Sequence, residues 1–214
     1  MGKIVVLIGA PGAGKGTQAR LLRERRGIPQ ISTGDMFREM KTLDTPLAHE
    51  VQEIMASGKL VTDDITYRMV EDRTSRADCA DGYILDGYPR TEVQAEQLEE
   101  LAKAQGLEIQ AIEVDLPREE LMRRLTGRRS CPVCGEIYNI YSKPPKADNV
   151  CDLHADAQLI HRADDNLESV STRLATYDEQ TKPLIAFYEN SGRLEKIDGL
   201  GDVETIYAEL ERIV

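Results

Sequence analysis

The chain alternates between short apolar runs and longer stretches in which apolar residues recur every three or four positions. Short runs bounded by turn residues are typical of buried strands, and the longer pattern is typical of amphipathic helices. The predicted strands are 4–8, 30–32, 83–86, 111–115 and 194–197. The predicted helices are 19–26, 33–40, 46–57, 63–76, 91–104, 117–127 and 202–213. Strands that alternate with helices predict an α/β fold, with a parallel sheet and helices on both faces.

Two of these helices have recognisable start signals. The polar group Thr33, Gly34 and Asp35 precedes an apolar pattern, so we expect it to cap the helix that follows. Pro117 suits the first helical position, because the backbone N–H that proline lacks would have no partner there.

Residues 131–161 break the alternation, because they show no helical period and are interrupted by prolines and glycine. They hold two metal-binding pairs 16 residues apart, Cys131 with Cys134 and Cys151 with His154. Such a spacing brings four ligands within reach of one tetrahedral ion. A segment this small cannot bury enough apolar surface to fold alone, so a metal would replace a core. The segment therefore predicts a zinc-ribbon-like unit with one structural Zn²⁺; the alternative is a set of free thiols.

The strand at 4–8 leads into the glycine-rich loop 9–17 and then into a helix. Glycines let several backbone N–H groups turn toward one anion, and the helix N-terminus and Lys15 add positive charge. The pattern G-x-x-x-x-G-K-[ST] is satisfied as far as Lys15, but Gly16 stands at the hydroxyl position and Thr17 follows it. This layout predicts a phosphate-binding loop; the alternative is a glycine-rich turn with a surface lysine.

Asp86 ends the predicted strand 83–86, and an aspartate at this place beside a phosphate loop commonly serves magnesium. The alternative is a turn or cap residue. Several arginines gather in sequence around the cysteine segment, and arginine forks suit phosphate oxygens. Others would form ordinary surface ion pairs, and the acids of Arg162-Ala163-Asp164-Asp165 could simply orient arginines. The arginines of interest are Arg38, Arg90, Arg123, Arg124, Arg128, Arg129, Arg162 and Arg173.

Charge narrows the classes of function. The net charge of −11 argues against a general binder of nucleic acid or of membrane surfaces. The cysteine segment itself has two lysines, no arginine and four acids, which argues against a nucleic-acid-binding ribbon. No apolar run approaches the roughly 20 residues that span a bilayer, and we expect no signal peptide. The expected location is the cytoplasm, where cysteines suggest metal before disulfides.

Taken together, the motifs resemble bacterial adenylate kinases of the long type, which carry a zinc-binding lid. The resemblance covers the chain nearly end to end, and the Gly-Lys-Gly-Thr loop is also that of the family. The fourth metal ligand in this family is cysteine, histidine or aspartate, so His154 fits. The matching segments are 9–18, 31–38, 58–61, 85–91, 94–95, 125–129 and 162–165.

The resemblance implies a P-loop nucleoside triphosphate hydrolase-like core, made of residues 1–31, 62–126 and 165–214. It implies two mobile inserts: residues 32–61 would bind the nucleoside monophosphate, and residues 127–164 would form the lid over ATP. The implied reaction is reversible phosphoryl transfer from Mg-ATP to AMP, giving two ADP. The implied protein is a monomer whose partners are these nucleotides, with no nucleic acid or membrane.

The resemblance also implies the site residues, by number in this chain. The catalytic cations would be Lys15, Arg90, Arg128, Arg162 and Arg173. ATP would contact Gly12, Ala13, Gly14, Lys15, Gly16, Thr17, Arg124, Arg128, Ile137, Tyr138 and Gly201. AMP would contact Thr33, Arg38, Lys59, Leu60, Val61, Gly87, Tyr88, Pro89, Arg90, Gln94, Arg162 and Arg173. Mg²⁺ would be held through water by Asp35 and Asp86.

Three other interpretations stay open from the sequence. A UMP/CMP kinase shares the architecture, but members that select pyrimidines differ at the positions of Thr33 and Gln94. A guanylate-type kinase lacks the zinc lid. A non-catalytic nucleotide-binding or zinc-ribbon module is a different class, and the presence of Lys15, Asp86, Arg90 and Arg128 together argues against it.

Overall fold

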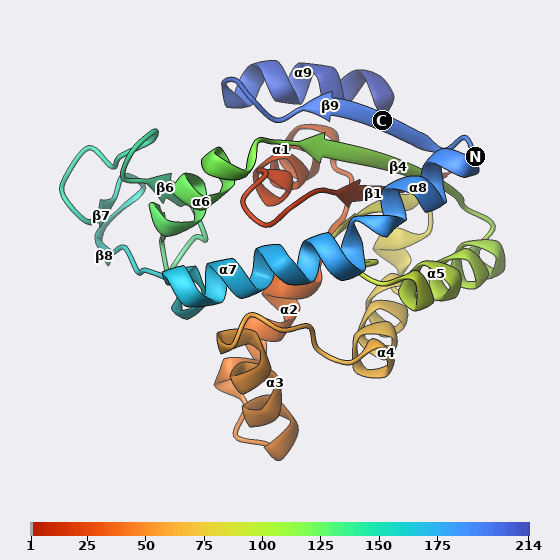
Figure 1. Cartoon of the computed structure of the whole chain (residues 1–214), viewed down its shortest axis with the longest axis horizontal. Helices are drawn as coiled ribbons and strands as arrows, with labels where there is room; N and C mark the ends of the chain where they lie inside the picture. The colour runs from red at the N-terminus through yellow and green to blue at the C-terminus, as the bar shows by residue number, and fades with distance from the viewer. Residues whose placement is uncertain (1) are drawn as a thin grey trace.

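The computed structural model describes residues 2–214, and in this part of the chain a five-stranded parallel sheet forms the centre (Figure 1). The strand order is β2-β3-β1-β4-β9, and every neighbouring pair is parallel. The strands of this sheet are β1 (Lys3–Ile8), β2 (Gln30–Ser32), β3 (Gly82–Asp86), β4 (Glu108–Asp115) and β9 (Leu194–Asp198). The predicted α/β class is therefore confirmed.

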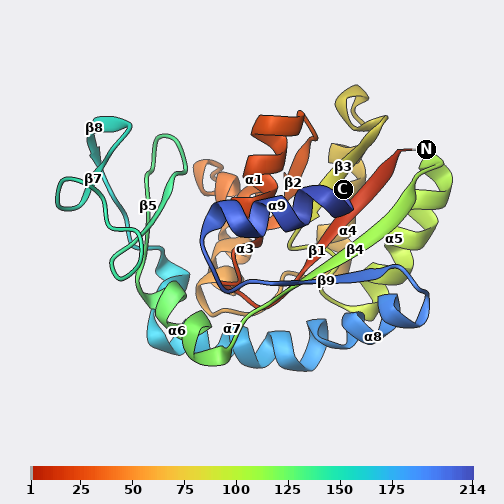
Figure 2. The same ribbon diagram turned by 90° about the horizontal axis from the view of Figure 1, so that it is seen from above.

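Helices cover both faces of the sheet (Figures 1 and 2). The α-helices are α1 (Lys15–Arg26), α2 (Thr33–Glu39), α3 (Pro46–Ala56), α4 (Asp63–Thr74), α5 (Glu92–Gln105), α6 (Arg118–Thr126), α7 (Leu167–Thr176), α8 (Pro183–Asn190) and α9 (Val203–Ile213). The shorter turns are η1 (Met40–Thr42), η2 (Ala77–Cys79), η3 (Ala163–Asp165) and the π-helical η4 (Tyr177–Thr181). Among these residues no helix is both long enough and apolar enough to cross a membrane.

The core is divided in two by the sheet, because successive side chains of a strand point to opposite faces. On β1, Ile4, Val6 and Ile8 join the cluster that packs against α5 and α8. Val5 and Leu7 join the cluster that packs against α1, α6, α7 and α9. A strand buried on both faces has to be apolar throughout, which is why β1 reads as a continuous apolar run.

The parallel arrangement brings the carboxyl ends of neighbouring strands to one edge of the sheet. Leu7 of β1 and Ser32 of β2 are both in register with Asp86 of β3. The loop that follows β1 therefore starts beside Asp86 and beside the start of α2. In open parallel sheets this edge is where ligands bind.

Two segments project from the core with small apolar clusters of their own (Figure 1). The first holds α2, η1 and α3, and it packs around Phe37, Val51 and Val61. The second begins after α6 and forms two small antiparallel sheets, away from the main sheet (Figure 2). Its strands are β5 (Arg128–Ser130), β6 (Ile137–Asn139), β7 (Val150–Cys151) and β8 (His154–Gln158). The absence of helical period in 131–161 thus reflects real β structure.

Several boundaries differ from the sequence-based predictions. The N-cap of α2 is Ser32, whose Oγ accepts from Asp35 N at 3.3 Å, and not the group Thr33 to Asp35. Thr33 already lies in the helix, and its hydroxyl donates to Gly87 O at 2.8 Å. Pro117 is the N-cap of α6 and not its first helical residue. Helix α1 starts at Lys15, before its apolar pattern begins, because Gly14 and the loop set its first turn.

The sequence-based predictions leave out α7 and α8. In α7 and at its C-cap, Leu167, Val170, Leu174 and Tyr177 follow a helical spacing that the prediction overlooked, and Val170 and Leu174 are buried in the core. Arg173 lies on the same side of the helix, between Ser169 and Val170, and it lines the cleft described below.

Candidate active site

The loop after β1 holds its lysine over its own backbone. Lys15 Nζ donates to Gly9 O at 2.7 Å and to Ala10 O at 3.0 Å. Gly14, the N-cap of α1, has φ +104°, a left-handed value that glycine tolerates best. Burial lowers the pKa of Lys15 to about 8, although the nearby Asp86 opposes this shift. The site thus presents a cation and a helix N-terminus, which together favour a bound anion.

The structure explains why glycine stands at position 16, where the strict motif has a serine or threonine. A methyl group built at Gly16 would lie 3.1 Å from Asp86 Oδ2, closer than side chains normally approach. The loop therefore passes close to the carboxylate at the end of β3. A side chain at this position would require the Asp86 carboxylate to shift by a few tenths of an ångström.

Asp86 and Asp35 face the same cleft. Burial raises the pKa of Asp86; Lys15 opposes this shift and Asp35 adds to it. Burial also acts to raise the pKa of Asp35, but Arg38, paired with it at 2.5 Å, outweighs burial and leaves the pKa below its usual value. Two carboxylates beside a phosphate loop are the oxygen ligands that Mg²⁺ takes, directly or through water.

A buried carboxylate holds two of the predicted arginines. Asp165 is fully buried and accepts from Arg128 Nε at 2.7 Å, from Arg128 Nη2 at 2.5 Å and from Arg173 Nη1 at 3.1 Å. Arg173 also pairs with Asp164 at 3.1 Å. The sequence left the role of these acids open, and the structure shows that they orient arginines.

The other predicted cations lie close by. Arg90 Nε donates to Gly87 O at 2.8 Å, and Arg162 Nε donates to Ser130 Oγ at 3.0 Å. Burial lowers the pKa of Arg90 to about 10, and Arg173 adds to this shift. Burial and Arg128 likewise lower the pKa of Arg162 to about 10. Because neighbouring arginines add to the effect of burial in both cases, these cations lie close to one another.

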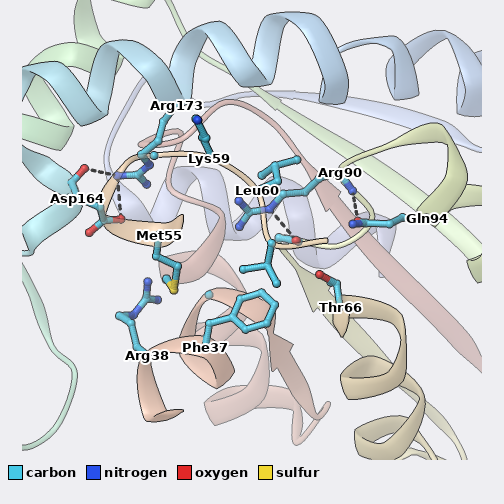
Figure 3. A pocket seen from close by; sticks show the side chains of 14 residues that line it. Phe37, Arg38, Met55, Lys59, Leu60, Thr66, Arg90, Gln94, Asp164 and Arg173 are labelled. Carbon is cyan, nitrogen blue, oxygen red and sulfur yellow. Dashed lines mark hydrogen bonds and ion pairs between the residues drawn. The ribbon is translucent and has the colours of Figure 1, made fainter. Parts of the chain in front are cut away.

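One pocket opens between α2, the chain after α3 and the turn after β3 (Figure 3). Eight of the residues predicted to contact AMP line it: Arg38, Lys59, Leu60, Val61, Gly87, Arg90, Gln94 and Arg173. Two others lie behind its wall, since Thr33 is 2% exposed and Tyr88 is fully buried. Pro89 and Arg162 line the adjoining cleft instead.

That larger cleft runs along the phosphate loop to the second projecting segment, and every residue predicted to contact ATP lines it. Arg124 is fixed at one side, because its Nη2 donates to Gly199 O at 3.0 Å. The Tyr138 side chain is almost fully buried, and its hydroxyl lies 3.6 Å from Cys151 Sγ. Tyr138 therefore joins the cleft wall to the cysteine cluster.

The four predicted zinc ligands come together. The ligand atoms of Cys131, Cys134, Cys151 and His154 all lie within 4.8 Å of one another. Cys134 Sγ is 3.8 Å from Cys151 Sγ, and Cys151 Sγ is 3.8 Å from His154 Nδ1. Zn–S bonds of about 2.3 Å in a tetrahedron place two sulfur atoms about 3.8 Å apart. The donor set and its spacing therefore fit a closed Cys₃His zinc site.

Comparison with known proteins agrees with this geometry. A sequence model of the family described as "Adenylate kinase" matches residues 7–193. The chain belongs to the adenylate kinase family. An adenylate kinase of Anaeromyxobacter dehalogenans is 48% identical over 212 residues, with 99% of each chain covered. One of Caldanaerobacter subterraneus subsp. tengcongensis is 47% identical over 209 residues, covering 97% of this chain and 94% of that one. One of Oceanobacillus iheyensis is 46% identical over 211 residues, with 98% of each covered.

The predicted family, fold and enzyme class are thereby confirmed, and the chain is a phosphotransferase of the adenylate kinase family. The interpretations as a non-catalytic module and as a guanylate-type kinase do not fit this match. The limits of the inserts and the roles of individual residues stay predictions. The sequence analysis did not identify Asp63, which accepts a hydrogen bond from the side chain of Gln94. Asp63 belongs to no recognisable sequence motif, so only the structure shows this contact.

The ion pairs of Asp165 with Arg128 and Arg173 lead to a prediction about stability. Asp165→Ala removes the buried partner of Arg128 and Arg173, so we expect the free energy of unfolding to fall by about 3–5 kcal/mol. Asp178→Ala breaks the exposed pair with Arg118 and should lower it by no more than about 1 kcal/mol. Urea unfolding at pH 7 measures both. Equal, small losses would contradict the buried-pair interpretation.

Proposed function

We propose that the chain transfers the terminal phosphoryl group of Mg-ATP to AMP, reversibly, to give two ADP. The observation that carries the proposal is the convergence of five cations, between the phosphate loop and the pocket of Figure 3. Two nucleotides that meet there bring a large negative charge, which five cations can neutralise. These cations are Lys15, Arg90, Arg128, Arg162 and Arg173.

ATP would lie along the larger cleft with its phosphates on the loop from Gly12 to Thr17. The N–H groups at the start of α1 and Lys15 would bind the β- and γ-phosphate oxygens. Arg124 and the lid residues Ile137 and Tyr138 would flank the nucleotide. Bound Mg²⁺ would neutralise phosphate charge, with Asp35 and Asp86 holding its waters.

AMP would lie in the smaller pocket, with its phosphate between Arg38, Arg90 and Arg173. Gln94 lines the pocket and carries the only side-chain amide among the pocket residues named above, so it would read the base. The backbone near Gly87 would complete the wall. Thr33 would act from behind this wall, since its hydroxyl already binds Gly87 O.

The chemistry needs no general base. The acceptor is a phosphate oxygen that is already anionic near pH 7, because the second pKa of a phosphomonoester is about 6. The barrier arises from repulsion and misalignment between two anions, so the cations act by positioning and by electrostatic stabilisation. Closure of residues 127–164 would exclude water, which otherwise competes for the γ-phosphate.

The remaining assignments belong to the same proposal. The core would be residues 1–31, 62–126 and 165–214, with the AMP-binding insert at 32–61. One structural Zn²⁺ would hold the lid through its four ligands and leave no open position for chemistry. The enzyme would act as a cytoplasmic monomer.

The direct test is a coupled assay with Mg-ATP and each nucleoside monophosphate. We expect AMP to be used far better than GMP, CMP or UMP, because a site built to bind one base edge leaves its polar groups unpaired with another. A preference for CMP or UMP would instead support the pyrimidine-kinase interpretation, and no turnover with any acceptor would contradict the proposal.

Lys15 makes a prediction about turnover and pH. Lys15→Met should leave the fold intact and lower kcat roughly 10²- to 10³-fold, as expected for a lost charge at the transferred group. In the unsubstituted enzyme Lys15 loses its proton as pH rises through about 8, so ATP binding should weaken from pH 8 to 9. Calorimetric titration with ATP at pH 7, 8 and 9 checks this. A pH profile that persists unchanged in Lys15→Met would assign the titration to another group.

The metal makes a prediction about the lid. We expect one zinc per chain, and Cys134→Ser or chelation should lower the thermal midpoint and weaken ATP binding. Phosphoryl transfer should persist at low temperature with saturating ATP, because the ion does no chemistry. His154→Ala should act more mildly, since three thiolates and a water can still hold zinc.

Metal analysis combined with calorimetry measures these effects. Cys79→Ser is the matched control, because Cys79 is buried in the core and should leave the zinc content unchanged. A purified protein with no metal and no response to chelator would disprove the zinc assignment.

A further inference from the structure

The side-chain amide of Gln94 is held from two sides, although it lines the pocket (Figure 3). Its Oε1 accepts from the backbone N–H of Arg90 at 2.8 Å. Its Nε2 donates to Asp63 Oδ1 at 2.8 Å. Turning the amide over would set N–H against N–H at Arg90 and a carbonyl oxygen against the Asp63 carboxylate. The amide therefore has one favoured orientation.

Asp63 is itself anchored to the turn that carries Gln94. It is the first residue of α4, and its Oδ1 also accepts from Thr91 Oγ1 at 3.1 Å. Thr91 is the N-cap of α5, and its hydroxyl oxygen accepts from Gln94 N at 3.2 Å. The Asp63 carboxylate thus accepts hydrogen bonds from Thr91, the N-cap of α5, and from Gln94 in the first turn of the same helix. Asp63 is not among the residues that line the pocket, so it lies behind the pocket wall.

The two anchors leave Gln94 with a defined pair of free groups. A primary amide has two N–H donors and two acceptor lone pairs, and one of each is already used. The remaining N–H and lone pair are complementary to adenine, which offers a ring nitrogen acceptor beside an amino donor. A 6-oxo purine offers the reverse, a ring N–H donor beside a carbonyl acceptor. The orientation of this amide therefore decides which purine it matches.

We propose that Asp63 is a positioning residue that determines base specificity, by fixing the Gln94 amide in the orientation that matches adenine. This inference rests on the proposed function, since it concerns what sets base choice in the AMP pocket. Asp63 acts through Gln94 and does not touch the base.

The test is the ratio of kcat/KM for AMP to kcat/KM for inosine monophosphate, with Mg-ATP as donor. Asp63→Ala should lower this ratio roughly tenfold, the worth of one hydrogen bond to a charged group. The loss should fall on AMP, while KM for ATP stays unchanged. Asp63→Asn retains an acceptor oxygen and should keep most of the selectivity.

Asp64→Ala is the matched control. Asp64 also lies in the first turn of α4, and it pairs with Arg68 at 3.2 Å on the surface. Its removal takes away the same charge from the same helix end without touching Gln94, so the ratio should not change. If Asp63→Ala does not fold, Asp63→Leu is used in its place, because leucine fills similar space but has no hydrogen-bond acceptor. The same ratio of kcat/KM values is then measured for Asp63→Leu.

The outcomes separate this inference from the proposed function. Equal losses with AMP and inosine monophosphate in the Asp63 variants, or an unchanged ratio, would make Asp63 merely structural and overturn the inference. An unsubstituted enzyme that shows no preference for AMP would instead contradict the proposed function. A lowered ratio in Asp63→Ala, restored in Asp63→Asn and absent in Asp64→Ala, supports the inference.

Discussion

Several positive side chains share one buried cleft, where each makes the charged form of its neighbours less stable. Burial is the first cause of the lowered pKa values of Lys15, Arg90 and Arg162, and the neighbouring cations lower them further. The cluster holds together because each cation has a fixed oxygen partner: backbone carbonyls for Lys15 and Arg90, a hydroxyl for Arg162, and Asp165 for Arg128 and Arg173. In the proposed function, two bound nucleotides would bring negative charge to this group of cations.

The sheet makes this concentration possible. Parallel strands end at one edge, so the loop after β1, Asp86 at the end of β3 and the start of α2 meet without any local sequence relation. The two projecting segments supply the remaining cations from Arg38 on one side and Arg128 and Arg162 on the other. Each of these segments has a small apolar cluster beside the main core.

Polar side chains behind the site are as specific as those in it. Asp165 fixes the direction of two guanidinium groups, and Asp63 fixes the direction of one amide. In both cases a buried or half-buried carboxylate converts a flexible polar side chain into an oriented one. Such preorganisation is what electrostatic catalysis and base recognition require.

The sequence alone determined the features whose cause is local. Short-range patterns in the sequence mark apolar β1, the glycine loop with Lys15 and the two Cys-x-x-Cys/His pairs. Tertiary structure alone decided features whose cause lies across the chain. The tight space at Gly16 is due to Asp86, and the partners of Asp165 and Asp63 lie 8 to 37 residues away in the sequence. A hydrogen bond between such distant residues leaves no periodic trace in sequence, so only the folded chain shows it.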